Sequence, residues 1–440
     1  MPGNMALKLN RKKIGRNVAL FVCLCGLLGA IEFFLPASLA LYSLQTKASK
    51  DNVSGEIIVV GIDSQSIKAV GRWPWSRETQ AQLLRAIDEY NPKSIYVDIG
   101  YQGRTTANAD SALREAISNT KAPTTVIALA TTDGDGDVQT IYSHPAAVGT
   151  APFVTAHSPY LFGYIWSLPT TLKAPRGQLQ SVAANIAGRP VPENTNFRVN
   201  YSLNPDSIPI YRAKDIMTKA VDPSKLAGKT VILGVTDKTQ NDVHSMPAWG
   251  ERPGVAFHVL GAETLKRGYP IEAGWIPFFL LATAVCVALL TAKGLHYSTH
   301  ITIACSILIL VISTFLTTQH IGNDPFPSIL LLVISGVYIA RQKAALLRSQ
   351  RDPKTGLSDM TGYMVDEVMA NTWFVGATPL VATSLRSYIA PEDEIQIAKE
   401  IAKRLSTIID ERQLAHNGNQ QFLWEMPPIA TGELAAHLEG

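Results

Sequence analysis

The sequence predicts an α/β protein in three parts: an outer domain with a mostly parallel α/β sheet, four transmembrane helices, and a small cytoplasmic α/β domain. The first observation behind this prediction is composition, because 46% of the 440 residues are hydrophobic and only 17% are charged, which is apolar for a soluble protein. The second is a set of long apolar runs near both ends of the chain. The third is an alternation of β-rich and amphipathic runs between them.

The apolar runs predict four membrane spans at about 1.5 Å of rise per helical residue. The first span covers residues 17–44 and follows a basic N-terminus at residues 1–16, and three more spans lie within residues 274–340. A cleaved signal peptide is the alternative for the first run, since residues 37–40 have small side chains at a suitable spacing. Because Glu32 is costly in lipid, we expect it near the outer interface or against another span.

The charged flanks of these runs predict their orientation. With the basic N-terminus inside, the loop at residues 319–324, which has no Lys or Arg, lies outside, and the basic helical linker at residues 341–351 lies inside. This arrangement satisfies the positive-inside rule. Residues 45–272 are therefore expected outside the membrane and residues 352–440 in the cytoplasm.

The charge and the cysteines exclude several classes of function. A formal net charge of +3 is too small to indicate a nucleic-acid partner. All four cysteines lie in apolar runs, so neither a disulfide nor a metal site is expected. The histidines are scattered, and His244, His258 and His416 are interpreted as surface or packing residues. The sequence has no P-loop and no serine–histidine–acid set.

The outer segment alternates between strand-like and helix-like runs. This order predicts a mostly parallel sheet with helices on both faces. The region at residues 133–201 is rich in turn formers and allows no detailed prediction. The predicted strands cover residues 56–63, 94–99, 124–129 and 229–235, and the predicted helices cover residues 80–91, 110–119 and 255–268.

Two strand ends and an aromatic segment predict a binding pocket in the outer domain. Pro74 favours an extended Trp73, and Ser76 can cap a helix that begins at Arg77. Ligands of open α/β sheets bind outside the carboxyl ends of the strands. The alternative is a core plug of the two tryptophans, with Arg72 or Arg77 paired to Asp63 or Asp98. The candidate ligand-binding residues are Asp63, Arg72, Trp73, Trp75, Arg77 and Asp98.

The outer segment resembles a known family of sensor domains. The motifs "VVGIDSQSIKAVGRWPWSRE", "IYVDIGY", "FRVNY", "LAGKTVILGVTDKTQNDVHSMP" and "RPGVAFHVLGAETL" look like successive motifs of the second CHASE family, over residues 54–267. The resemblance implies an extracellular stimulus sensor of a bacterial signalling protein, with one leading span and about three trailing spans. The loop at residues 236–242 lacks some of the glycine typical of the family.

The cytoplasmic segment resembles the cyclase-type GGDEF domain. "DPKTGL" looks like its entry motif and "IAKRL" like its mid-domain helix. The stretch "HNGNQQFLWEMP" predicts a hairpin, because Asn-Gly favours a tight turn and the following residues favour a strand. Its "GNQQF" stands where the family has its signature. The chain ends at Gly440, so this domain is either abbreviated or part of a longer protein.

The residues in the signature positions imply that catalysis is lost. The family's chemistry requires a glycine pair near the nucleotide and carboxylates that hold Mg²⁺ against GTP. The degenerate signature is Gly418, Asn419, Gln420, Gln421 and Phe422, and Ser384 and Arg386 stand at the lost acid positions. No catalytic residue, metal site or cofactor is therefore expected, and Mg²⁺ and GTP would be needed only by an active cyclase.

These expectations combine into a bacterial inner-membrane sensor with both termini in the cytoplasm. It would detect a periplasmic ligand, act as a homodimer in the lipid bilayer, and signal through a cytoplasmic partner in cyclic di-GMP type signalling, with no nucleic acid involved. The alternatives are an active diguanylate cyclase that makes cyclic di-GMP from GTP, or a fragment of a GGDEF/phosphodiesterase protein.

Overall fold

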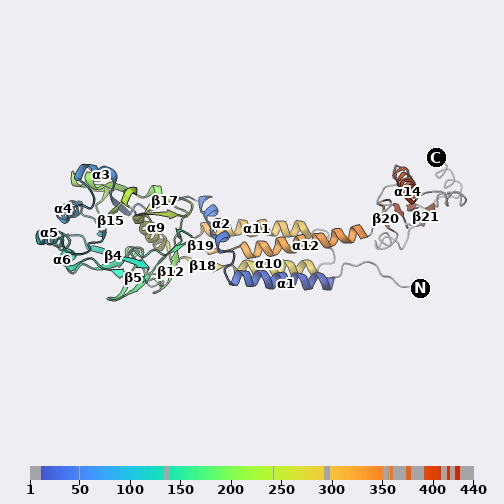
Figure 1. Cartoon of the computed structure of the whole chain (residues 1–440), viewed down its shortest axis with the longest axis horizontal. Helices are drawn as coiled ribbons and strands as arrows, with labels where there is room; N and C mark the ends of the chain where they lie inside the picture. The colour runs from blue at the N-terminus through green and yellow to red at the C-terminus, as the bar shows by residue number, and fades with distance from the viewer. Residues whose placement is uncertain are drawn as a thin grey trace. The chain divides into compact units, whose positions relative to one another are not determined.

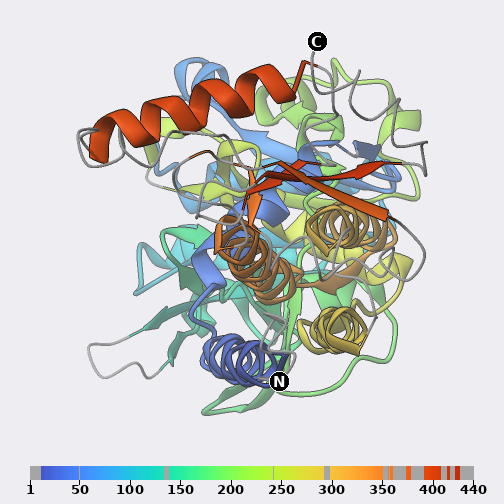
Figure 2. The ribbon, with the colours of Figure 1, turned by 90° about the vertical axis from the view of Figure 1, so that its right-hand side faces the viewer.

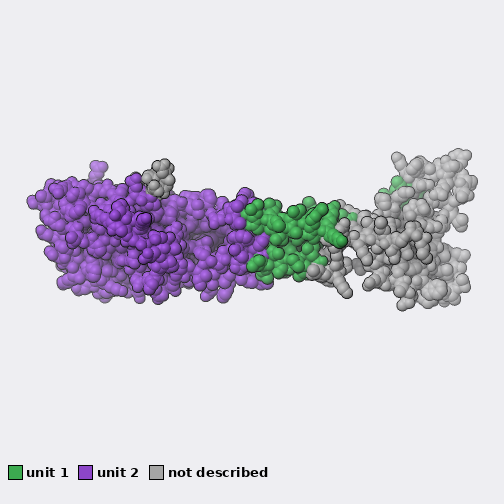
Figure 3. All heavy atoms as spheres, turned by 90° about the horizontal axis from the view of Figure 1, so that it is seen from below, with its two compact units in different colours: residues 1–27, 280–307, 328–440 green, residues 28–279, 308–327 purple. Residues whose placement is uncertain are grey.

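The fold is described from a computed structural model. It describes residues 11–48, 50–132, 138–240, 242–291, 298–349, 355, 357–359, 373–377, 391–407, 414–416 and 422–426. The chain forms two compact units, coloured in Figure 3. The sheet unit comprises residues 28–279 and 308–327, and the helical unit comprises residues 1–27, 280–307 and 328–440.

A mostly parallel sheet forms the centre of the sheet unit, as predicted. Its strand order is β14-β2-β15-β3-β4-β5, with β6 also paired to β4. All of its pairs are parallel except β4 with β5. The strands are β2 (Ile57–Ile62), β3 (Ser94–Asp98), β4 (Thr124–Thr132), β5 (Val138–Ile141), β6 (Phe153–Thr155), β14 (Ile210–Arg212) and β15 (Thr230–Val235).

Helices cover both faces of this sheet because alternate strand residues point to opposite sides. Ile58 and Val60 of β2 pack into a cluster with residues of α4 (Arg77–Asp88), α5 (Ala107–Ser118) and α8 (Ala213–Met217). Ile57 and Val59 pack into a second cluster with residues of α7 (Val182–Ala187) and α9 (Gly254–Arg267). The run of apolar residues in β2 therefore reflects burial on both sides.

The region that the sequence left open forms short strands beside the central sheet. β17, β16, β8 and β7 form a second sheet, and β10 and β11 form a hairpin. The elements of the sheet unit not named above, within this region and outside it, are β1 (Asp51–Asn52), α3 (Ser64–Val70), α6 (Pro145–Val148), β7 (Tyr160–Leu161), β8 (Tyr164–Ile165), β9 (Ser167–Pro169), β10 (Thr171–Ala174), β11 (Gly177–Gln180), β12 (Asn196–Arg198), β13 (Leu203–Asn204), β16 (Val243–Met246), β17 (Gly250–Pro253), β18 (Ile271–Gly274) and β19 (Ile321–Asn323).

The first apolar run forms two helices, so the prediction of one continuous span over residues 17–44 is wrong. Helix α1 (Arg11–Ala30) ends in a turn, and α2 (Leu35–Ala48) follows. Glu32 adopts a φ of 55° in this turn, and the N–H of Phe33 donates to the carbonyl of Leu28 at 2.9 Å. This bond closes the end of α1. Glu32 is exposed on the turn, outside both helices.

Two of the four predicted spans have the length and composition of a membrane span. These are residues 12–30 and residues 299–318, and the apolar parts of the other two helices, residues 276–290 and 326–342, are shorter. The helices that contain the last three runs are α10 (Ile276–Thr291), α11 (Ser298–Thr318) and α12 (Phe326–Ser349). The four-span arrangement therefore stays a prediction.

The helical unit is held together by side-chain contacts between distant parts of the sequence. The amide of Asn17 donates to the hydroxyl of Tyr338 at 2.6 Å, and the ring of Phe21 meets Tyr338 edge-on at 5.5 Å. α1, α10, α11 and α12 run side by side in Figure 1, and Figure 2 shows them nearly end-on as one group.

The described part of residues 352–440 contains the antiparallel strand pair of the predicted hairpin. β22 (Leu414–His416) pairs antiparallel with β23 (Phe422–Met426), so that His416 faces Phe422. The predicted helix is α14 (Pro391–Leu405), and β20 (Ser358–Asp359) and β21 (Trp373–Ala377) complete a sheet of order β20-β22-β23-β21. Ser384 and Arg386, which stand at the lost acid positions, lie outside the described residues, as does the turn with Gly418, Asn419, Gln420 and Gln421.

Candidate ligand-binding site

The sheet unit has a pocket with a volume of about 870 Å³ at the carboxyl edge of the central sheet. Asp98 ends β3, Val235 ends β15, and α4 begins at Arg77, and all three line this pocket. Parallel strands place their carboxyl ends at one edge, which is why these distant residues meet. The other lining residues are Trp73, Pro74, Trp75, Ser76, Glu78, Gln80, Ile99, Gly100, Tyr101, Gln102, Thr105, Thr106, Ala109, Leu129, Gln240 and Asp242.

The aromatic segment before α4 forms one wall of the pocket. Ser76 caps α4 by accepting the N–H of Thr79, as predicted. Trp75 is 5% exposed, and its indole N–H donates to the carbonyl of Gly71 at 2.7 Å. Trp73 is half-buried and meets the Trp75 ring edge-on at 5.7 Å. The core-plug interpretation therefore holds for Trp75, while Trp73 is a pocket wall.

Arg77 is buried against partners that the sequence analysis did not identify. Its guanidinium forms an ion pair with Asp110 of α5 and donates to the carbonyl of Gly103 at 3.0 Å. The hydroxyl of Thr105 and then Arg77 hold the pKa of Asp110 below its ordinary value. Pairing of Arg77 with Asp63 or Asp98 is therefore wrong, because Asp110 in the first turn of α5 already neutralises it.

Two of the six predicted ligand-binding residues do not line the pocket. The carboxylate of Asp63 accepts the backbone N–H of Ser66 at 2.8 Å as the cap of α3, and it pairs with Arg212 at 3.2 Å. Arg72 is exposed and lies outside the lining residues. Trp73, Trp75, Arg77 and Asp98 are the predicted residues that the fold brings together.

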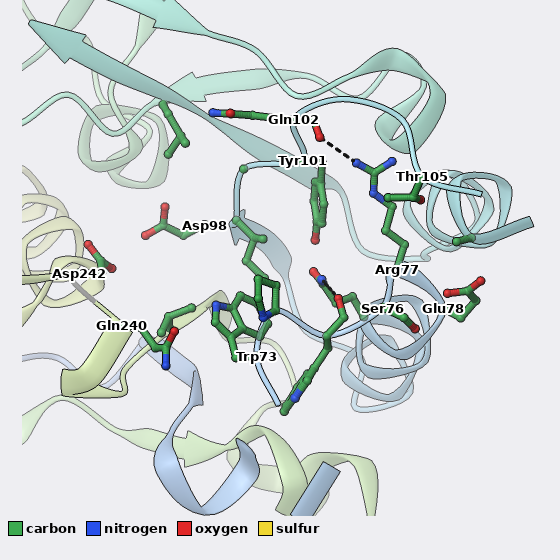
Figure 4. A pocket seen from close by; sticks show the side chains of 18 of the residues that line it. Trp73, Ser76, Arg77, Glu78, Asp98, Tyr101, Gln102, Thr105, Gln240 and Asp242 are labelled. Atoms are coloured by element: carbon green, nitrogen blue, oxygen red, sulfur yellow. Dashed lines mark hydrogen bonds between the residues drawn. The ribbon is translucent and has the colours of Figure 1, made fainter. Parts of the chain in front are cut away.

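A second carboxylate and two histidines join Asp98, and the sequence analysis did not select them. In Figure 4 the side chains of Asp98 and Asp242 point toward each other. The Nε2 atom of His258 lies 3.9 Å from the Asp98 carboxylate, and that of His244 lies 3.1 Å from Asp242. The description of His258 as a packing residue is correct for its burial, since it is 5% exposed, but it also packs against the site.

Burial controls the charges in this cluster. It raises the pKa of Asp98 to about 7, and the negative charge of Asp242 adds to the effect. Burial also lowers the pKa of His258 to about 4, so this imidazole is neutral at pH 7. Asp98 therefore titrates near neutral pH, which is typical of functional sites.

The arrangement defines a class of protein: an α/β domain with a pocket at the carboxyl edge of its sheet, in a chain that also has apolar helices. The particular family follows from comparison with protein-family models, in which the CHASE2 domain matches residues 18–292. The chain belongs to the CHASE2 domain family, which indicates an extracellular sensor role in signal transduction. The match is wider than the predicted residues 54–267, since it begins within α1 and reaches the end of α10. Searches of curated proteins and of solved structures gave no match.

Proposed function

We propose that this chain is a bacterial inner-membrane sensor whose CHASE2 domain binds a small periplasmic ligand in the pocket of the sheet unit. Four transmembrane helices would carry the signal to a cytoplasmic domain that is GGDEF-like but catalytically degenerate, and that acts in cyclic di-GMP type signalling. The observation that carries the proposal is the 870 Å³ pocket at the edge of the sheet where α/β folds bind ligands.

Further features support the membrane part of this proposal. The basic N-terminus and the basic linker at residues 341–351 favour a cytoplasmic location for both termini. The helical linker can pass a shift or rotation of α12 to the segment that follows. A homodimer and a cytoplasmic signalling partner complete the proposed relay.

Small molecules bound to the purified protein test whether the pocket is a ligand site. The full chain and two variants would be purified from the same bacterial host in lipid nanodiscs, and bound molecules would be identified by mass spectrometry. Gln102 is an exposed residue of the pocket lining, so Gln102→Trp is expected to place an indole ring in the pocket, obstruct the ligand and lower the amount of bound molecule. Arg104→Trp adds the same ring two residues away, outside the lining, and should retain it.

A bound molecule present in equal amount in all three proteins would contradict the proposal, because it would have to lie elsewhere. The same holds if none of the three carries a molecule that is absent from empty nanodiscs. Hydrogen exchange of the central strands in each variant shows whether Gln102→Trp keeps the fold.

The enzyme alternative predicts turnover of GTP. We expect the full chain in nanodiscs with GTP and Mg²⁺ to make no cyclic di-GMP above an empty-disc control, because Gln420 and Gln421 are neutral amides and lack the carboxylates that hold Mg²⁺ against the triphosphate. Mass spectrometry of the reaction mixture measures this. Clear production of cyclic di-GMP would contradict the assignment of a degenerate domain and favour the diguanylate cyclase. A fragment of a GGDEF/phosphodiesterase protein would also make no cyclic di-GMP in this assay.

A further inference from the structure

The charges of the pocket exclude an anionic ligand. This inference rests on the proposed function and concerns the class of ligand. Of the described residues that line the pocket, Arg77 is the only basic one, and Glu78, Asp98 and Asp242 are acidic. The charge of Arg77 is already neutralised by Asp110 in a buried ion pair. An anion would therefore meet carboxylates without a free counter-charge.

Asp98 lacks the partners that a buried carboxylate normally has. Its side chain is 11% exposed. Among the described residues, none donates a hydrogen bond to this carboxylate. The nearest basic atom is Nε2 of His258, at 3.9 Å. Since His258 is neutral at pH 7, it supplies no positive charge. Buried carboxylates are usually paired or coordinated, so Asp98 has the properties of a binding group.

Asp242 contacts a histidine through a hydrogen bond that a neutral imidazole can make. One ring nitrogen of His244 contacts the hydroxyl of Tyr160, and the other lies 3.1 Å from Asp242. A neutral imidazole fits both contacts, because Nε2–H donates to Asp242 while Nδ1 accepts the tyrosine O–H. His244 thus orients Asp242 toward Asp98 without neutralising it.

Gln80 is a second, independent sign that the pocket lacks a hydrogen-bond donor. This side chain is 4% exposed, and its Nε2 atom donates to the carbonyl of Trp75 at 2.8 Å. Its Oε1 atom has no hydrogen-bond partner, and Gln80 lines the same pocket. A buried acceptor without a donor is costly, so Gln80 leaves one hydrogen-bond acceptor of the lining unsatisfied.

The rest of the wall favours an organic cation over a metal ion. The ring of Trp73 forms part of the lining, and indole faces attract ammonium groups and pack against apolar groups. In the described parts of the chain, no group of three or more His, Cys, Asp or Glu side chains could hold a metal ion. Two carboxylates beside an indole suit one ammonium centre with an apolar substituent.

We propose that the ligand is a small organic cation whose ammonium group lies between Asp98 and Asp242 and whose apolar part packs against Trp73. The site is acidic, and the Asp98 side chain is largely shielded from water, since it is 11% exposed. The Asp242 side chain is 40% exposed, so a ligand can enter on that side.

Matched pairs of probes test this class of ligand. Isothermal titration of the full chain in nanodiscs at pH 8 compares choline with dimethylbutanol, benzylamine with benzyl alcohol, and putrescine with butanediol. At least one cation is expected to bind about tenfold more tightly than its neutral counterpart. Asp98→Asn should remove that preference, while Glu115→Gln, an exposed acid of α5 outside the pocket, should leave it unchanged.

Every other result contradicts the inference, and each one identifies which part of it is wrong. Neutral probes that bind as tightly as the cations, and that Gln102→Trp excludes, would overturn the ligand class and leave the pocket as a ligand site. Mg²⁺ that binds in the pocket more tightly than every organic cation would assign the two carboxylates to a metal. No binding of any cation, or binding that persists in both Gln102→Trp and Asp98→Asn, would remove the proposed site itself.

Discussion

At pH 8, replacing Asp98 by asparagine is expected to stabilise the sheet unit by up to about 4 kcal/mol. Asp98 ionises with a pKa of about 7 in the fold, against an ordinary value of 3.8, because burial and then the charge of Asp242 oppose its negative form. At pH 8 the folded protein therefore holds a carboxylate that would ionise more easily in the unfolded chain. Asparagine keeps the shape and removes the charge.

The pH dependence of this effect has a definite sign. Because the folded pKa of Asp98 is raised, its protonated form contributes stability below about pH 4, and this contribution is lost as the pH rises to 7. The benefit of Asp98→Asn should therefore be largest at pH 7 and above and approach zero near pH 4. His258 acts oppositely: its folded pKa is lowered to about 4, so its contribution is present above about pH 6.5 and lost on acidification.

Hydrogen exchange of β2, β3 and β15 in the full chain measures this stability between pH 4 and 8. With Asp98→Asn, the contribution of Asp98 should disappear while that of His258 remains, so stability should fall as the pH drops below about 6.5. Glu115→Gln is the control, and a change within about 0.5 kcal/mol is expected for such an exposed residue. Equal stability of wild type and Asp98→Asn at pH 8 would contradict the charges assigned to the pocket.

A residue that lowers stability at its working pH suggests a functional reason for its presence. Asp98 is such a residue, because its carboxylate lies in the pocket and its side chain is only 11% exposed. A bound cation would offset the cost that the fold carries at Asp98.

The sequence was sufficient to place one half of the pocket. Asp98 follows a buried strand and Ser76 caps the next helix, so both could be assigned to the same sheet edge from local patterns. Asp63 looked equivalent to Asp98, but α3 begins immediately after it and uses its carboxylate as a cap. An aspartate directly before "SQS" can cap a helix that begins there, and this pattern would have removed Asp63 from the candidate ligand-binding residues.

The other half of the pocket depends on contacts between distant segments. Asp110 reaches Arg77 only because α5 packs beside α4, and Asp242 reaches Asp98 only because β15 lies next to β3. Neither contact has a spacing in the sequence that would reveal it. An acid soon after a predicted strand was the one available sign of Asp242, and His258 carried none, since it lies on a helix buried almost throughout.

Loss of signalling is the second large effect that we expect, and it results from obstructing the pocket with an added indole ring. After bound small molecules have been removed by dialysis, a small-molecule extract of the host cells would be added to the full chain in nanodiscs, and hydrogen exchange of residues 391–407 would be followed. In wild type and Arg104→Trp, the extract should change the exchange rate of this segment. In Gln102→Trp it should not, because the ligand is excluded from the CHASE2 domain.

This exchange measurement tests the central claim most directly, since it links occupancy of the pocket to residues 391–407. A response in wild type and Arg104→Trp that is absent from Gln102→Trp is the predicted result. A response that persists in Gln102→Trp, or an exchange rate that is the same with and without extract in all three proteins, would contradict the account of this chain as a sensor that acts through this pocket.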